Sequence, residues 1–151
     1  MTYHKPVLLT ESIEGLNIKP DGIYVDVTFG GGGHSKEILK NLKNGFLYGF
    51  DQDLDAEKNS IKSNNFKFIR SNFRYIKNFL RLEGVKKIDG LIADLGISSF
   101  QIDTPKRGFA HKHDSIIDMR MNVDSDFGAK DILNSYSEIE IARVFYDYGD
   151  I

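Results

Sequence analysis

Residues 24–35 read YVDVTFGGGGHS, and this stretch decides the fold. Together with Ile23, its first half is a short apolar run with β-branched residues, which is typical of a buried strand. Four glycines follow, and a helical pattern that places Ile38, Leu39 and Leu42 on one face begins directly after them. Glycine is needed where a chain turns sharply and where a ligand approaches the free N–H groups of a helix start. The stretch therefore predicts a strand, a glycine turn and a helix.

A second predicted strand, Phe46–Asp51, ends in a carboxylate 21 positions after Gly30. An acid at about this distance from a glycine turn suits the two hydroxyls of a ribose. The alternative is a tight strand-to-helix connection without a ligand, but the combined pattern favours a nucleoside-bearing cofactor. NAD and S-adenosylmethionine both satisfy this geometry.

The rest of the first hundred residues repeats the alternation of strand and helix. Apolar runs predict further strands at 66–70 and 88–95, and helical patterns lie around 9–16, 36–45, 53–62 and 74–83. This order predicts an α/β fold, a doubly wound parallel sheet with right-handed crossovers and the strand order 3-2-1-4. Beyond residue 95 the pattern becomes irregular up to residue 123, and two short helices without further strands are expected after it.

Composition limits the class of protein. The 151 residues contain no cysteine, which excludes disulfides and thiolate metal sites, and no metal site is predicted. The sequence has no apolar run of membrane-spanning length, so we expect a cytoplasmic protein without a membrane partner. The overall net charge is −2, yet residues 57–87 hold nine basic and two acidic residues. That stretch is either a solvated helix face or a surface for an anionic polymer.

Ligands of an open parallel sheet bind beyond the carboxyl ends of its strands. The glycine turn, Asp51, the segment 71–73 with Phe73, and Asp94 at the end of the fourth strand all belong to that edge. We expect Asp51 to bind ribose, Phe73 to lie against a purine and Asp94 to contact the reacting end of the cofactor. The alternatives are a core aromatic for Phe73 and a turn-capping acid for Asp94.

Five sequence blocks carry a family resemblance when they are taken in order. They are TFGGGGHS at 28–35, DQD at 51–53, DLGISSFQID at 94–103, RGF at 107–109 and DMRM at 118–121. In this combination the chain resembles the bacterial 16S ribosomal RNA cytosine-N4 methyltransferase family (RsmH or MraW), in its N-terminal half. The resemblance implies a class I, Rossmann-like methyltransferase sheet that uses S-adenosylmethionine. It further implies a helical inserted domain and, as substrate, the exocyclic amine of a cytosine in the decoding region of 16S rRNA in the small ribosomal subunit.

The resemblance also assigns residues to roles. The cofactor would contact Gly32, Gly33, His34, Asp51, Phe73, Asp94 and Gln101. Arg107, Phe109 and Arg120 would face the target nucleotide, and Asp94 and Asp118 are the candidate catalytic acceptors of the amine proton. The alternatives are a structural hydrogen bond for His34 and surface ion pairs for Arg107 and Arg120.

Two departures from the family pattern stand out. Residues 114–117 read DSII where the family has a Gly-Pro turn, and the family members are about twice as long as this chain. We therefore assign residues 1–104 to the N-terminal part of the methyltransferase domain and 105–151 to the truncated start of the inserted domain. Two other functions remain possible at this point: an NAD-dependent oxidoreductase, and a non-enzymatic, truncated RNA-binding remnant.

Strand four is expected to form an edge of the sheet if no further strand follows it. Unpaired apolar edges promote aggregation. We therefore expect the isolated 151 residues to be poorly soluble or partly unfolded, and to transfer no methyl group. The residues expected on this edge are Ile88, Leu91, Ile92 and Leu95.

Overall fold

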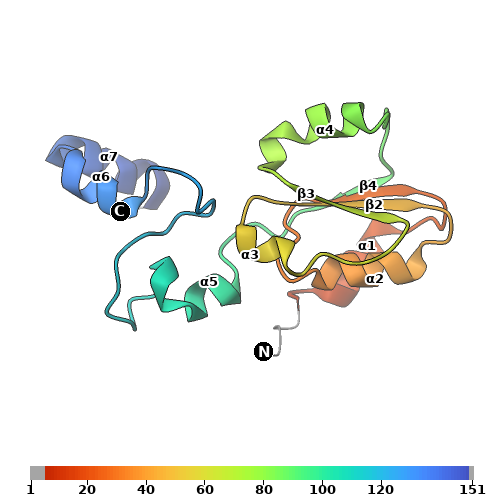
Figure 1. Ribbon diagram of the computed structural model, residues 1–151, viewed down its shortest axis with the longest axis horizontal. Coiled ribbons are helices and arrows are strands. Elements are labelled where there is room, and N and C mark those ends of the chain that lie inside the picture. Colours follow the sequence, from red (N-terminus) through yellow and green to blue (C-terminus); the bar gives the residue numbers. More distant parts are fainter. Residues whose placement is uncertain (1–5, 150–151) are drawn as a thin grey trace. The chain divides into compact units, whose positions relative to one another are not determined.

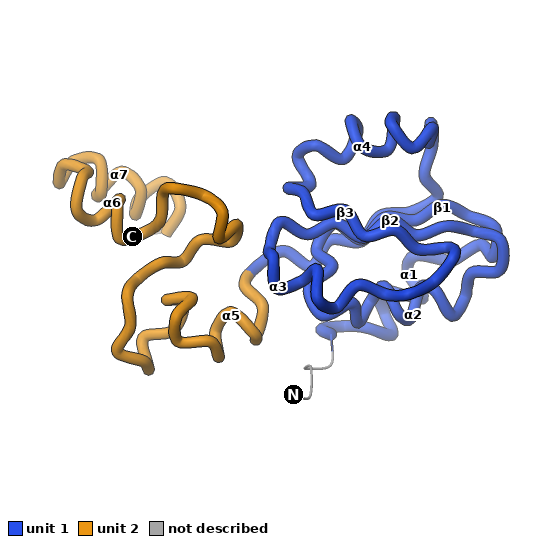
Figure 2. The backbone as a smooth tube through the Cα atoms, viewed as in Figure 1, with its two compact units in different colours: residues 1–96 blue, residues 97–151 orange. Residues whose placement is uncertain are grey.

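The computed structural model describes residues 6–149, so the outermost residues of both predicted domains lie outside the described part. It contains two compact units, residues 1–96 and 97–151, each of which is described by itself (Figure 2). The predicted domain boundary at residue 104 stays a prediction, because a compact unit of this chain and a domain of a longer fold need not coincide.

The first unit carries all the strands that the structure describes. Its elements are α1 (Leu9–Leu16), β1 (Ile23–Asp26), α2 (Gly33–Asn41), β2 (Phe46–Asp51), α3 (Leu54–Glu57), β3 (Phe66–Arg70), the 3-10 helix η1 (Phe73–Tyr75), α4 (Ile76–Leu82) and β4 (Gly90–Ile92). The strands are parallel and their order is β3-β2-β1-β4, which confirms the predicted doubly wound topology.

Helices cover both faces of this sheet, with α1 and α2 on one side and α4 on the other (Figure 1). Neighbouring residues of β1 alternate between the faces, as the strand period requires. Tyr24 belongs to the core that includes Ile38 of α2, whereas Val25 belongs to the core that includes Leu80 of α4. The sheet is thus buried on both faces, as expected for parallel strands.

Two predicted helices and one predicted strand are longer than the elements in the structure, beginning with the two helices. The crossover helix ends at Asn41 instead of near residue 45, and the N–H groups of Lys43 and Gly45 instead donate to the carbonyl of Pro20. The helix expected at 53–62 is only α3, after which the Asn59 side chain donates to the Gly30 carbonyl at 3.0 Å. In both cases the helix ends early because the chain after it forms hydrogen bonds to a turn next to β1: the turn at Pro20 before the strand, or the glycine turn at Gly30 after it.

The fourth strand is also shorter than predicted, three residues instead of eight. Within the described residues it pairs with β1 alone, so the expectation that it lies at an edge agrees with the structure. Leu91 and Leu95 are exposed, by 45% and 70%. Ile88 and Ile92, however, pack against the two cores, so only half of the predicted apolar edge is uncovered.

The second unit consists of α5 (Ser99–Asp103), the 3-10 helix η2 (Pro105–Arg107), α6 (Ala129–Ser135) and α7 (Glu138–Gly149), with a long irregular segment between η2 and α6. No strand is described in it, as predicted. Among the helices described, none has the length and apolar character needed to cross a membrane.

Candidate functional site

The glycine turn connects β1 to α2 at the carboxyl edge of the sheet. Gly30 and Gly32 have φ values of 49° and 71°, a region that residues with a Cβ rarely adopt. A Cβ on Gly32 would also lie 2.7 Å from the Phe29 ring, and one on Gly49 of β2 would lie 2.9 Å from the same ring. The buried Phe29 ring therefore requires glycine on both sides, and it fixes the shape of the turn.

Asp51 closes the turn from the neighbouring strand. Its carboxylate accepts a hydrogen bond from the Gly30 N–H at 2.8 Å and another from the Asp53 N–H at 2.9 Å. Burial raises the pKa of Asp51, although these backbone donors oppose the shift. Asp51, the residue predicted to bind ribose, thus lies against the predicted glycine turn, at the edge of the sheet where a nucleoside is expected.

Asp26, the last residue of β1, was not among the predicted site residues. Its side chain is buried, and its two oxygens accept from Ser35 Oγ at 2.7 Å and from the Thr28 N–H at 3.1 Å. Burial raises the pKa of this carboxyl, more than the Ser35 and Thr28 hydrogen bonds lower it. Through these hydrogen bonds Asp26 connects the end of β1 to the glycine turn and to the start of α2. A charged residue inside an apolar run is the sequence signal that identifies it.

Thr28 joins the turn to the segment after β4. Its Oγ1 accepts from the Asp94 N–H at 2.7 Å, which brings residues 66 positions apart together. The Asp94 side chain is exposed beside the glycine turn and accepts no hydrogen bond within the described residues. The structure thus places Asp94 with Asp51 at one edge, as predicted.

His34 and Phe73 also belong to this unit. The His34 ring is buried, and its Nε2 lies 3.1 Å from the Val7 carbonyl, which is the structural hydrogen bond considered as its alternative. Phe73 is 43% exposed and is therefore not a core aromatic. It follows Asn72, whose side chain accepts from the Arg74 N–H and donates to Gln52 after β2. These bonds hold the Phe73 segment beside the end of β2.

The remaining predicted site residues lie in the second unit, so their distance from the glycine turn is not defined. Gln101 is buried in α5, where it forms a capping box with Ser98 and its Nε2 lies 3.3 Å from the Met121 sulfur. The predicted cofactor residue is thus connected to the DMRM block at 118–121. The structure brings the predicted residues together in two groups, one in each unit.

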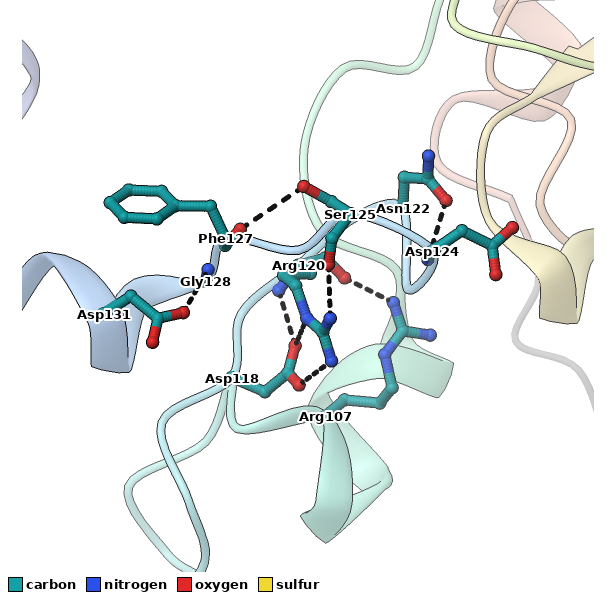
Figure 3. Close-up of polar contacts among 9 residues, drawn as sticks. All are labelled: Arg107, Asp118, Arg120, Asn122, Asp124, Ser125, Phe127, Gly128 and Asp131. Atoms are coloured by element: carbon teal, nitrogen blue, oxygen red, sulfur yellow. Dashed lines mark hydrogen bonds and ion pairs between the residues drawn. The ribbon is translucent and has the colours of Figure 1, made fainter.

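The second group centres on Asp118 and Arg120 (Figure 3). Arg120 Nε and Nη2 donate to the two Asp118 oxygens at 2.9 and 2.7 Å, and Arg107 Nη2 donates to the Arg120 carbonyl at 2.8 Å. The Arg120 hydrogen bonds lower the pKa of Asp118. The ion pair considered as the alternative for Arg120 is present, whereas Arg107 is 3% exposed and lies 5.9 Å from the Phe109 ring centre.

The backbone around this ion pair is closely packed. A Cβ on Gly108, whose φ is 72°, would collide with the backbone at Ile116 and Asp118. Met119 has a φ of 55°, uncommon for a residue with a side chain, and its N–H donates to the Arg107 carbonyl at 2.9 Å. The segments 107–109 and 116–120 therefore pack closely against each other, although residues 114–117 lack the Gly-Pro turn of the family. Strained backbone of this kind is common at functional sites.

Comparisons with known proteins identify the family. The model of the MraW methylase family matches residues 1–151. The chain is similar to proteins named ribosomal RNA small subunit methyltransferase H, with 60% identity in Cytophaga hutchinsonii and 53% in Bacteroides thetaiotaomicron. These alignments cover 99% and 100% of this chain, but 51% and 50% of the relatives, so the chain spans about half their length. A solved rRNA methylase from Streptococcus thermophilus is 20% identical, over 54% of this chain and 51% of its own, with a TM-score of 0.41.

Proposed function

The chain belongs to the MraW methylase family, and from that premise we propose that it is the cofactor-binding part of an S-adenosylmethionine-dependent rRNA methyltransferase. The proposed target is the N4 amine of a cytosine in the decoding region of 16S rRNA, within the small ribosomal subunit in the cytoplasm. The observation that carries the proposal is the Asp51 carboxylate bound to Gly30 of the glycine turn. Membership in a methylase family argues against the NAD-dependent alternative.

The residues present fit the cofactor. Gly30 and Gly32 form a turn with no side chains, and the Asp51 carboxylate has lone pairs beyond the two that Gly30 and Asp53 use, so it can also accept from ribose hydroxyls. Phe73 is exposed at the same edge and offers a flat face to adenine. In this assignment Gly32, Gly33 and His34 would hold the methionine end and Asp94 would complete the pocket on the first unit, whereas Gln101 is assigned to the cofactor by the family resemblance alone.

When bound, the cofactor supplies a methyl group that its sulfonium already activates. The protein would contribute alignment of the amine and an acceptor for its proton. Of the two candidates, Asp94 suits the acceptor role better. Both Asp118 oxygens accept hydrogen bonds from the positively charged Arg120, which lowers the pKa of Asp118 and makes it a weaker base. Asp118 then acts by orienting Arg120.

Arg107, Phe109 and Arg120 are proposed to receive the target nucleotide. A base must leave its stack before its exocyclic amine can reach a methyl donor. Aromatic rings and guanidinium groups are the side chains on which unstacked bases lie. Phe109 and Arg120, which are both partly exposed, provide these two groups, and the buried Arg107 holds their segments together through its bond to the Arg120 carbonyl.

Calorimetry with S-adenosylmethionine tests the cofactor site. Asp51→Ala should weaken binding by about 1.5–3 kcal/mol, because charge-assisted hydrogen bonds to ribose are lost. Asp21→Ala is the matched control, since this exposed acid precedes β1 at the opposite edge, and it should leave the affinity unchanged. Equal affinities of the wild type and Asp51→Ala would remove Asp51 from the site, and preferential binding of NAD would refute the proposal.

The reaction itself is tested by incubating small-subunit rRNA with methyl-labelled S-adenosylmethionine and analysing the digested nucleosides. We expect a complete version of the protein, with the length of its relatives, to place the label in N4-methylcytidine; in that protein Asp94→Ala should abolish the label and Asp118→Asn should reduce it less. Label at another atom would contradict the assigned substrate. Cofactor binding without any transfer would support the truncated, non-enzymatic alternative.

A further inference from the structure

The outer side of the helical segment formed by η1 and α4 carries a row of basic side chains. Arg74, Lys77 and Arg81 are three and four residues apart, which places them on one side of the helical segment, and all are exposed. The opposite side, with Leu80, packs on the sheet. The row spans about 10 Å along the helix axis. Since α4 covers the face of the sheet opposite α1 and α2, this row is remote from those helices (Figure 1).

These charges are not neutralised by acids. Three other basic residues of the stretch 57–87 form ion pairs: Lys58 with Asp55 at 2.6 Å, Lys67 with Glu83 at 2.7 Å and Arg70 with Glu57 at 3.9 Å. These pairs use both acids of the stretch. Within residues 6–149, Arg74, Lys77 and Arg81 have no carboxylate oxygen within 4.0 Å of their side-chain nitrogens, in contrast to these three pairs.

An aromatic side chain accompanies the basic row. Tyr75 is 48% exposed, and the Arg74 guanidinium lies 5.7 Å from its ring centre. Basic groups beside exposed aromatic rings are the combination that binds single-stranded RNA, because phosphates meet the charges and bases stack on the rings. A solvated helix face would explain the charges alone, but it gives no reason for an exposed tyrosine among them.

We propose that the α4 surface, defined by Arg74, Tyr75, Lys77 and Arg81, binds the phosphate backbone of the rRNA substrate and stacks one base on Tyr75. This inference rests on the proposed function and adds a second contact area on the first unit. The contact would be independent of sequence, because phosphates and ring faces are common to all nucleotides.

Salt-dependent binding of a 16S rRNA fragment, followed by fluorescence anisotropy, tests the charges. Removing two phosphate contacts with Lys77→Gln and Arg81→Gln should reduce the slope of log K against log salt by about 1.4 and weaken binding about 25-fold at 0.1 M salt. Lys40→Gln with Lys43→Gln is the matched control, because these exposed lysines lie at the end of α2 on the other face. The control should change neither quantity.

Tyr75 tests the stacking contact separately. Tyr75→Ala should weaken RNA binding about 5- to 160-fold without changing the salt slope, and Tyr75→Phe should retain the wild-type affinity. An unchanged slope in the Lys77/Arg81 variant, an equal change in the Lys40/Lys43 control, or an unaltered affinity in Tyr75→Ala would overturn the α4 surface. The proposal would also be overturned if the Lys77/Arg81 variant lost affinity for anionic phospholipid vesicles while its RNA binding stayed unchanged.

The test separates the two proposals. Binding of S-adenosylmethionine by the α4 variants should equal that of the wild type, because none of the substituted residues belongs to the cofactor site. If the wild type fails to bind S-adenosylmethionine, the proposed function fails, whereas the RNA slopes still decide on the α4 surface. If cofactor binding is normal and the RNA slopes do not respond, only the α4 surface is refuted.

Discussion

Replacing Asp26 tests how the glycine turn is held. In Asp26→Ala, the Ser35 hydroxyl and the Thr28 N–H both lose their acceptor in a buried site. In Asp26→Asn, the amide oxygen still accepts from Thr28 and the amide nitrogen donates to Ser35 Oγ, which can also accept. The two substitutions therefore separate loss of the hydrogen bonds from loss of the charge.

The expected magnitude follows from the number of orphaned donors. Leaving one buried polar group unsatisfied costs about 1–3 kcal/mol. Ser35 is fully buried, whereas Thr28 is only partly buried and water reaches it more easily. We therefore expect Asp26→Ala to lower the free energy of unfolding by about 2–4 kcal/mol. Asp26→Asn should lower it by less than about 1 kcal/mol at pH 7.5, since the geometry is kept.

Urea unfolding followed by circular dichroism measures both values, provided that the m-value is unchanged. The pH dependence gives a second check. Burial raises the pKa of Asp26 above its ordinary 3.8, so the folded state binds this proton more tightly than the unfolded state. The wild type should lose stability relative to Asp26→Asn as the pH rises from below 3.8 through the folded-state pKa. Equal destabilisation by Asn and Ala, or a difference that grows in the opposite pH direction, would refute this reasoning.

Two further predictions concern the same turn. Gly32→Ala should destabilise the protein by about 1–3 kcal/mol more than Gly84→Ala in thermal unfolding, because both sites have positive φ but only Gly32 faces the Phe29 ring; equal losses would show that the ring moves away freely. Thr28→Val should weaken binding of S-adenosylmethionine about 2- to 12-fold by releasing the Asp94 segment, with Thr28→Ser as the control that keeps the acceptor. 5′-Methylthioadenosine, which lacks the methionine end, should bind Thr28→Val and the wild type equally; parallel losses for both ligands would contradict a specific role.

The sheet could be predicted because its signals are local. The apolar runs at 23–27 and 46–51, and the glycines between them, define strands and a turn regardless of distant contacts. Strand order followed from topology and the right-handed crossover rule. Helix lengths could not be predicted in the same way. Asn59 leaves α3 and bonds to Gly30, and no local pattern indicates a bond across 29 positions.

The candidate site was predicted in part. Asp51 and Asp94 could be placed because each ends a strand at the carboxyl edge. Asp26 was missed because the apolar run at 23–27 was interpreted only as a strand, and the hydrogen bonds of Asp26 with Thr28 and Ser35 are visible only in the structure. In the second unit, the family resemblance supplied Arg107 and Arg120, but the structure alone shows that they are joined by a hydrogen bond to a backbone carbonyl.

The Phe29 ring has a consequence for how sequences of this kind change over time. It lies against Gly32 and Gly49, two positions on different elements that would each clash with it if they gained a side chain. A smaller residue at 29 relieves the clash at 32, but at 49 the Phe66 ring also lies 2.9 Å from an added Cβ, so both rings would have to become smaller there. Positions 29, 49 and 66 should therefore covary among homologues, and the order of substitution is constrained: both rings must shrink before Gly49 is replaced, whereas Gly32 is also held by its φ of 71°.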